Sequence, residues 1–164
     1  MALLLTSTKT PVGNLFLVAD QHVLLGANFS GFESVMQSLE IEFGHQDVSK
    51  VKNIPVISDL ISDYFDGDVE AINAIAVRQS GASFSQAAWK AMRKVKAGKT
   101  LSYAELAQRA GSPAAVRASG SACAKNAVVI VVPCHRIVKT GGALGNYAYG
   151  LDIKEWLLRH ESAL

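Results

Sequence analysis

The chain has 164 residues, of which 49% are hydrophobic, so it is long enough to bury one good core or two small ones and too apolar for a disordered protein. Its formal net charge of +2 permits binding to nucleic acid without requiring it, because attraction depends on where the charges cluster. The two cysteines, at positions 123 and 134, give neither a zinc-binding spacing nor the pattern of a secreted disulfide scaffold.

No targeting segment is evident in the sequence. Residues 1–6 are apolar but too short for a signal peptide and lack its basic flank, and no stretch is long enough to span a membrane. We therefore expect a cytoplasmic protein, or a nuclear one in a eukaryote, with no membrane partner. We also expect no metal ion and no cofactor.

The first part of the chain, residues 3–29, has the residue pattern of short strands. Apolar runs at residues 15–19 and 23–27 are separated by polar residues, and the Pro-Val-Gly-Asn stretch at 11–14 is typical of a turn. These features predict a small antiparallel meander.

Helical patterns follow the meander. Ser30 and Glu33 have the spacing of a capping box and precede apolar residues at helical spacing. Residues 57–65 form a second amphipathic segment, which Gly67 ends. Residues 71–77 are interpreted as one more strand. This half therefore predicts a small α+β unit, which carries no catalytic constellation.

The second part of the chain, from about residue 80, is a run of predicted helices. A capping-box pattern over residues 83–86 opens a helix that extends to Lys96, and a second box over residues 102–105 opens a helix that stops near Gly111. We place a domain boundary near residue 80, where the run of predicted helices begins. The expected domains are residues 1–79, an α/β support domain, and residues 80–164, a mostly helical domain.

A third helix, opened by Ser112 and Pro113, completes a helix-turn-helix pattern. The pattern alone is weak, because helical hairpins are common in protein cores. Small side chains dominate this helix over residues 114–122, which suits a surface that approaches a DNA backbone closely. A final helix is expected from Asp152 to about Glu161.

Cys134 and His135 adjoin within a rigid apolar segment, residues 131–138. A lone cysteine is most often a small buried hydrophobe, but the cationic side chains of His135 and Arg136 favour the reactive thiolate. Neighbouring residues on a strand point to opposite faces, so contact between the histidine and the sulfur needs a bend or a bridging water. The loop that follows, residues 139–150, is rich in glycine and tyrosine and could line a base pocket or be an ordinary surface loop.

These segments together resemble the O6-alkylguanine-DNA alkyltransferases. The resemblance covers residues 84–161 in register and rests on residues 116–120, 126, 133–136, 145–147 and 154–161. Residues 1–79 resemble the family only loosely. The fold that the resemblance implies is α+β, with a small sheet-plus-helix domain of ribonuclease H-like type followed by a mostly helical, winged helix-turn-helix domain.

The resemblance implies a DNA repair protein that transfers an alkyl group to its own Cys134, once and irreversibly. The substrate would be O6-alkylguanine in duplex DNA, chiefly O6-methylguanine, with O4-methylthymine as a further candidate. His135 would act as a base through a water molecule, oriented by Glu161, while Asn126 would support the active-site turn. The Tyr103 hydroxyl would donate a proton or hydrogen bond to the leaving base.

The same resemblance implies how DNA is held. The alkylated base is flipped out of the duplex, Arg117 fills the gap, and the second helix lies in the minor groove of DNA bound by a monomer. Further contacts to the DNA backbone and to the flipped base are expected as follows. Ser85, Ser112 and Thr140 would contact the DNA backbone, and Tyr103 would also bind the DNA. The pocket for the flipped base would be lined by Tyr147, Ala148 and Tyr149.

The chain departs from the family pattern at four positions. Ala127 stands where proline is usual and Ser119 where valine is common, and we expect neither to abolish the chemistry. Ala148 and Tyr149 stand where some members have serine and glycine.

Three other functions stay open from the sequence. They are a non-enzymatic alkyltransferase-like protein that binds damaged DNA, against which Cys134 argues, a helix-turn-helix regulator, and a hydrolase that uses Cys134, His135 and Glu161.

Overall fold

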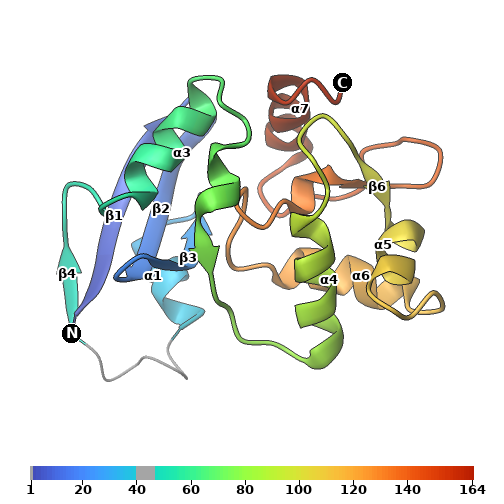
Figure 1. Cartoon of the computed structure of the whole chain (residues 1–164), viewed down its shortest axis with the longest axis horizontal. Coiled ribbons are helices and arrows are strands. Elements are labelled where there is room, and N and C mark those ends of the chain that lie inside the picture. The colour runs from blue at the N-terminus through green and yellow to red at the C-terminus, as the bar shows by residue number, and fades with distance from the viewer. Residues whose placement is uncertain (1, 40–46) are drawn as a thin grey trace. The chain divides into compact units, whose positions relative to one another are not determined.

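The computed structural model of the chain describes residues 2–39 and 47–164, which divide into two compact units (Figure 1). The first unit contains the residues up to Gln79 together with Ala127–Val131, and the second contains Ser80–Asn126 and Val132–Leu164. The chain therefore leaves the second unit after Asn126 and re-enters it at Val132, two residues before Cys134.

The first unit is built on a five-stranded sheet in the order β4-β1-β2-β3-β5. The strands are β1 (Leu3–Thr10), β2 (Gly13–Asp20), β3 (Val23–Asn28), β4 (Val48–Lys50) and β5 (Ala76–Val77). Strands β1, β2 and β3 pair antiparallel, which confirms the predicted meander, whereas β4 and β5 pair parallel to their neighbours. Gly13 has a φ of 121°, so the turn between β1 and β2 needs glycine at that position.

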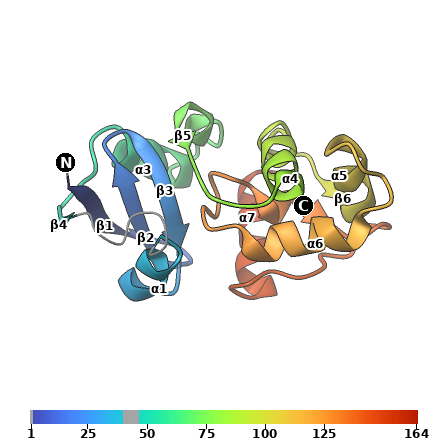
Figure 2. The same ribbon diagram turned by 90° about the horizontal axis from the view of Figure 1, so that it is seen from below.

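Helices cover both faces of this sheet, as Figure 2 shows for α1 (Phe32–Gln37) and α3 (Ile57–Phe65). One core cluster joins α1 to the strands and consists of Leu3, Leu5, Val18, Leu25, Val35 and Leu39. Both helices were predicted from their apolar spacing. The predicted strand over residues 71–77 is wrong in its first half, which is the 3-10 helix η1 (Ala71–Ala74).

The returning segment, residues 127–131, lies along β3. The Ala27 N–H donates to the carbonyl of Ala127 at 2.8 Å, and the Val129 N–H donates to the carbonyl of Ala27 at 3.1 Å. The Ala127 N–H, which a proline would lack, donates to Oε1 of Gln79 at 2.9 Å. This departure from the family pattern therefore gives the segment an additional hydrogen bond within the first unit.

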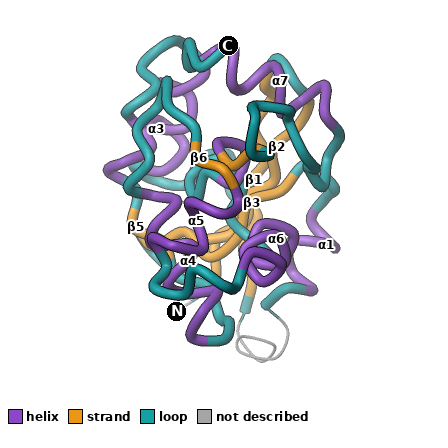
Figure 3. The backbone as a smooth tube through the Cα atoms, turned by 90° about the vertical axis from the view of Figure 1, so that its right-hand side faces the viewer, coloured by secondary structure: helices purple, strands orange, loops and turns teal. Residues whose placement is uncertain are grey.

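The second unit is mostly helical, and its elements follow one another along the chain with a two-stranded parallel sheet between them. They are α4 (Ser83–Arg93), β6 (Leu101–Ser102), α5 (Tyr103–Arg109), α6 (Val116–Lys125), the 3-10 turn η2 (Cys134–Arg136), β7 (Ile137–Val138) and α7 (Leu151–His160). Figure 3 shows α5 beginning where β6 ends. The Trp89 indole N–H donates to the carbonyl of Ala122 at 2.9 Å and so fixes α4 against α6.

Only one of the predicted capping boxes forms. Ser102 and Glu105 exchange both hydrogen bonds, at 3.0 Å each, and start α5 as expected. The boxes predicted at Ser30 and Ser83 are wrong, because α1 and α4 have Gly31 and Ala82 at their N-caps.

The predicted ends of three helices in the second unit are also wrong. Ser112 does not cap α6, whose N-cap is Ala115. Helix α7 begins after Gly150, earlier than the expected Asp152, and α4 ends at Arg93, earlier than Lys96. Among the described residues, no helix has the length and apolar character needed to cross a membrane.

Candidate active site

A tight turn, not a strand end, presents Cys134. Pro133 has φ and ψ of −83° and 66°, which places the Cys134 N–H 2.8 Å from the carbonyl of Val132. Cys134 then opens the turn η2, so this segment has the bend that contact between adjacent side chains requires. The Asn126 amide donates to the same Val132 carbonyl at 2.7 Å, which ties together the two ends of the segment that leaves the second unit.

A buried cluster of charged groups lies directly after the cysteine. Arg136 donates to both oxygens of the Glu161 carboxylate, from Nε at 2.8 Å and from Nη2 at 3.0 Å, and its Nη1 donates to the Val95 carbonyl at 2.6 Å. His135 Nε2 lies 2.8 Å from Oε2 of Glu161. Burial raises the pKa of Glu161, but His135 and Arg136 outweigh it and hold that pKa well below its usual range.

The protonation of Glu161 decides the tautomer of His135. An ionised carboxylate can only accept hydrogen bonds, so Nε2 of His135 carries the proton that faces it. Nδ1 is then the basic nitrogen; it is buried and has no hydrogen-bond partner in the part of the chain that the structure describes. Burial lowers the pKa of His135 despite the neighbouring Glu161, so the imidazole is neutral at physiological pH.

The thiol of Cys134 is only 6% exposed, and burial raises its pKa. Two groups act in the opposite direction, the Asn126 side chain through a hydrogen bond and Lys154 through its charge. Burial also raises the pKa of the second cysteine, Cys123, to about 12. Both cysteines are therefore thiols at neutral pH, and Cys134 needs a base to become a nucleophile.

Sequence reasoning missed Lys154 as part of this site. Its side chain is fully buried, and Nζ donates to the carbonyls of Ile137 at 2.6 Å and Asn146 at 3.0 Å. Lys154 thus joins β7 to the loop that was predicted to line the base pocket. Burial lowers its pKa, whereas the nearby thiolates would raise it. A local signal was present, because Lys154 lies three and four residues before Leu157 and Leu158 and so shares the buried face of α7 with them.

Tyr103 lies at the start of α5 against the same loop. Its hydroxyl accepts a hydrogen bond from the Asn146 N–H at 3.4 Å, and burial raises its pKa. A Cβ atom at Gly145 would lie 2.8 Å from that hydroxyl, and Gly145 has a φ of 78°, so glycine is required there for two reasons. On the other side, the Ser119 hydroxyl lies 2.9 Å from the carbonyl of Tyr103.

The structure places the other predicted residues around this core. Arg117 is exposed on α6, and the rings of Tyr147 and Tyr149 pack edge to face with centroids 5.8 Å apart. Ala148 is exposed between these half-buried tyrosines. The remaining three are distributed over separate elements: Ser85 on α4, Ser112 in the turn before α6 and Thr140 after β7.

The second unit is strongly basic. It contains twelve Lys and Arg residues against four Asp and Glu, a formal charge of +8, whereas the first unit contains four against ten, a formal charge of −6. Such a concentration of positive charge on a helical unit is typical of a nucleic-acid-binding surface. A basic helical unit that also buries a cysteine next in sequence to a paired histidine and carboxylate has the groups that a DNA-binding protein with a cysteine nucleophile would need.

Comparisons with known proteins identify the family. The model of the 6-O-methylguanine DNA methyltransferase DNA-binding domain matches residues 83–163. The chain is 37% identical over 168 residues to methylated-DNA--protein-cysteine methyltransferase of Salmonella typhimurium, covering all of this chain and 98% of that protein. It is 32% identical over 155 residues to the protein of the same name from Methanosarcina acetivorans, covering 94% and 96% of the two chains.

Solved structures agree with these matches. The O6-methylguanine methyltransferase of Mycobacterium tuberculosis superimposes with a TM-score of 0.77 at 29% identity, covering 98% of this chain and 93% of that one. The same organism's OGT in complex with DNA gives a TM-score of 0.80 at 28% identity, with the same coverage. The chain belongs to the methylated-DNA--protein-cysteine methyltransferase family, as its resemblance predicted, and the mixed α+β fold and enzyme class are confirmed.

Proposed function

We propose that this protein repairs O6-alkylguanine in duplex DNA by transferring the alkyl group, once and irreversibly, to Sγ of Cys134. The bond between the alkyl carbon and Sγ forms as the bond between that carbon and O6 breaks. The observation that carries the proposal is the buried thiol two residues before Arg136, in a segment whose histidine is held by Glu161 at 2.8 Å. O4-methylthymine is a further candidate substrate.

The proton of the thiol needs an acceptor, because burial keeps Cys134 protonated at neutral pH. Nδ1 of neutral His135 is that acceptor, through one water molecule, and Glu161 stabilises the imidazolium that forms. Arg136 keeps Glu161 ionised and fixed in place. Asn126 supports the turn through the Val132 carbonyl, so the thiolate is held at one position.

The leaving guanine also needs a proton or a hydrogen bond, which the Tyr103 hydroxyl supplies. The loop with Tyr147, Ala148 and Tyr149 encloses the flipped base, and Lys154 fixes this loop through the carbonyl of Asn146. Lys154 is a positioning residue that also offsets part of the cost of forming the thiolate, since its charge lowers the pKa of Cys134.

DNA binding belongs to the basic second unit. Its helix-turn-helix, with the segment after β7 as a wing, places α6 in the minor groove, and exposed Arg117 enters the duplex as the damaged base leaves. Ser85, Ser112 and Thr140 contact the DNA backbone. The protein acts as a monomer. Residues 1–79 form a ribonuclease H-like support domain, and residues 80–164 form the DNA-binding and acceptor domain.

One experiment tests the central proposal. The protein is incubated with duplex DNA that contains O6-methylguanine and is then weighed by mass spectrometry. We expect a mass increment of one methyl group per protein molecule, lost in Cys134→Ala and retained in the matched variant Cys123→Ala. An unmodified protein that binds the damaged duplex would indicate a damage-binding function, and many turnovers per molecule would indicate a hydrolase.

A further inference from the structure

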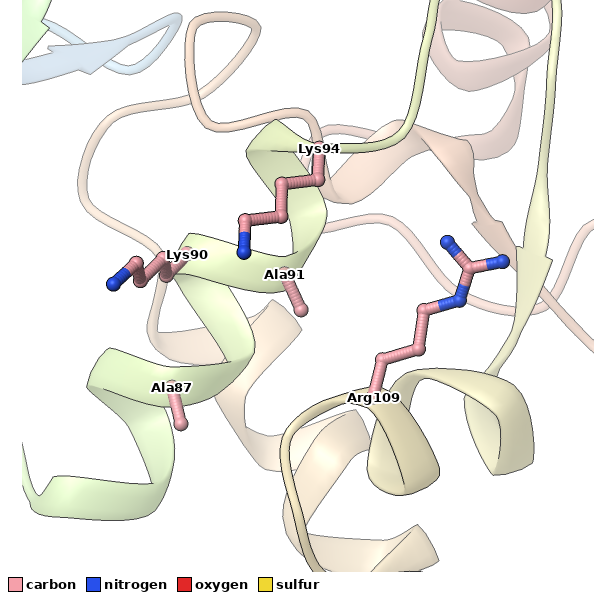
Figure 4. A pocket seen from close by; sticks show the side chains of 5 residues that line it. All are labelled: Ala87, Lys90, Ala91, Lys94 and Arg109. Atoms are coloured by element: carbon pink, nitrogen blue, oxygen red, sulfur yellow. The ribbon is translucent and has the colours of Figure 1, made fainter.

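A pocket of about 380 Å³ lies between α4 and α5, apart from the site around Cys134. It is lined by the small side chains of Ala87 and Ala91 and by Lys90, Lys94 and Arg109; in the view of Figure 4 the two lysine side chains extend away from the guanidinium of Arg109. Figure 4 shows the two lysine side chains extending from α4 and the guanidinium of Arg109 extending from α5.

The three cations at this pocket form no salt bridge in the described part of the chain. Lys90, Lys94 and Arg109 are exposed, and none has a carboxylate within 4 Å in the described part of the chain. The carboxylate of Glu105, four residues before Arg109 on α5, accepts the Ser102 N–H in its capping box and interacts with Arg109 through its charge alone, without a salt bridge. Three like charges around one hollow repel one another, and an anion in the hollow relieves that repulsion.

This pocket faces away from α6. Trp89 marks the side of α4 that contacts α6, through its hydrogen bond to Ala122. At 3.6 residues per turn, Lys90 and Lys94 lie about 100° and 140° around the helix from Trp89, and the two alanines lie about 160° from it. The residues that line the pocket therefore lie on a different side of α4 from Trp89, which contacts α6.

We propose that the α4–α5 pocket is a second anion site, which binds phosphate groups independently of the DNA face at α6. Arginine offers a planar set of donors that matches two phosphate oxygens, and lysines add mobile point charges around it. The small alanine side chains leave room for the phosphate to approach the backbone of α4. The phosphate comes either from the backbone of a second DNA segment or from a small polyphosphate.

The test begins with inorganic tripolyphosphate, titrated calorimetrically into the full-length protein. The pocket variant combines Lys90→Gln, Lys94→Gln and Arg109→Gln, and a control variant with the same loss of charge combines Lys9→Gln, Lys52→Gln and Lys99→Gln. We expect the affinity to fall at least about tenfold in the pocket variant and to change less than about twofold in the control. Equal binding by the wild type and the pocket variant, or no binding by the wild type, overturns the proposal.

A second arm identifies the source of the phosphate. An immobilised undamaged duplex is loaded with protein and then exposed to a labelled second duplex. Capture by the wild type and the control variant, but not by the pocket variant, identifies a second DNA segment. Tripolyphosphate binding without pocket-dependent capture identifies a small anion. Methyl transfer to Cys134 is measured in parallel at saturating duplex, where the loss of three positive charges from the second unit does not limit binding, and we expect the pocket variant to retain it, so failure of the repair function is seen separately.

Discussion

The two units of the chain bury different kinds of side chain. In the described part of the first unit, the buried polar residues are uncharged, namely Thr6, Asn28 and Ser58. The second unit buries five titratable side chains, namely Cys134, His135, Arg136, Lys154 and Glu161. Buried charges cost stability unless they are paired. Their concentration in the second unit therefore indicates that the functional site lies there.

The two units also differ in formal charge. The first unit, at −6, is repelled by a phosphate backbone, whereas the second, at +8, is attracted to it. This difference directs DNA to the unit that contains Cys134. We propose on this basis that the first unit contributes stability through its apolar core and that the second contributes the chemistry, and variants in each unit test that division.

The largest effect is expected when the buried ion pair of the second unit is broken. Arg136→Met leaves the Glu161 carboxylate buried without its bidentate partner, which should lower the free energy of unfolding by about 3–5 kcal/mol. Urea unfolding can be followed by tryptophan fluorescence, since both tryptophans, Trp89 and Trp156, lie in the second unit. The exposed pair of Arg159 with Glu155 is the control, and Arg159→Met should cost less than about 1 kcal/mol. Equal losses would show that burial of the charges has no energetic consequence.

A core truncation in the first unit should affect stability without affecting chemistry. Leu17, on β2, is fully buried, and Leu17→Ala should lower the free energy of unfolding by about 2–5 kcal/mol through a cavity. The rate of methyl transfer, measured by quenched mass spectrometry at a temperature where the variant is folded, should be unchanged. Val48→Ala, at an exposed position on β4, is the control for stability. A large fall in the transfer rate of folded Leu17→Ala would contradict a purely supporting role.

The pH dependence of transfer tests the buried base of the second unit. Burial lowers the folded-state pKa of His135 below its ordinary value of 6.5, so Nδ1 stays unprotonated and the transfer rate should be constant through neutral pH. As pH falls through the lowered pKa, the rate should fall by about tenfold per unit.

Stability should change in the same direction over that range of pH. Below 6.5 the unfolded chain binds a proton at His135 that the folded chain does not, so stability is full above 6.5 and decreases as the pH falls towards the folded pKa. The variant His22→Asn, at an exposed turn of the first unit, should leave both profiles unchanged. A transfer rate that already declines above pH 6.5 would contradict a neutral His135 with a lowered pKa.

The sequence predicted those features that local pattern controls. The meander follows from apolar runs and turn residues, and the capping box at Ser102 forms because Glu105 occupies the third helical position. The box at Ser83 fails because α4 begins one residue earlier, and the Gln86 N–H donates to the carbonyl of Ala82 instead. At Ser30, the side chain of Asn28 accepts the Ser30 N–H and so replaces the expected cap.

Features that depend on distant segments could not be predicted in this way. Lys154 is buried because two carbonyls, from β7 and from the following loop, converge on its ammonium group. The role of Arg136 depends on the Val95 carbonyl and Glu161, which lie 41 and 25 residues away in sequence. The adjacent pair of cysteine and histidine was visible in the sequence, and the family resemblance pointed to Glu161 and Asn126, but the burial that dominates both pKa shifts and the charge of Lys154 were not foreseen.

The smallest expected effect concerns Ser119, where the family commonly has valine. Its hydroxyl is fully buried and lies within hydrogen-bond distance of two carbonyls, those of Val116 at 2.7 Å and Tyr103 at 2.9 Å. Ser119→Ala removes this donor and should lower the free energy of unfolding by about 0.5–1.5 kcal/mol, while Ser121→Ala, exposed on the same helix, should change it by less than about 0.5 kcal/mol.

The same pair of variants separates stability from positioning. If Ser119 only stabilises the packing of α6 on α5, Ser119→Ala will transfer the methyl group from DNA at the wild-type rate when folded. If it also positions Tyr103, the transfer rate will fall and the variant will lose discrimination among leaving bases that differ in their need for a proton. We expect the first result, because the Tyr103 hydroxyl is already held at the loop by the Asn146 N–H and the close approach of Gly145.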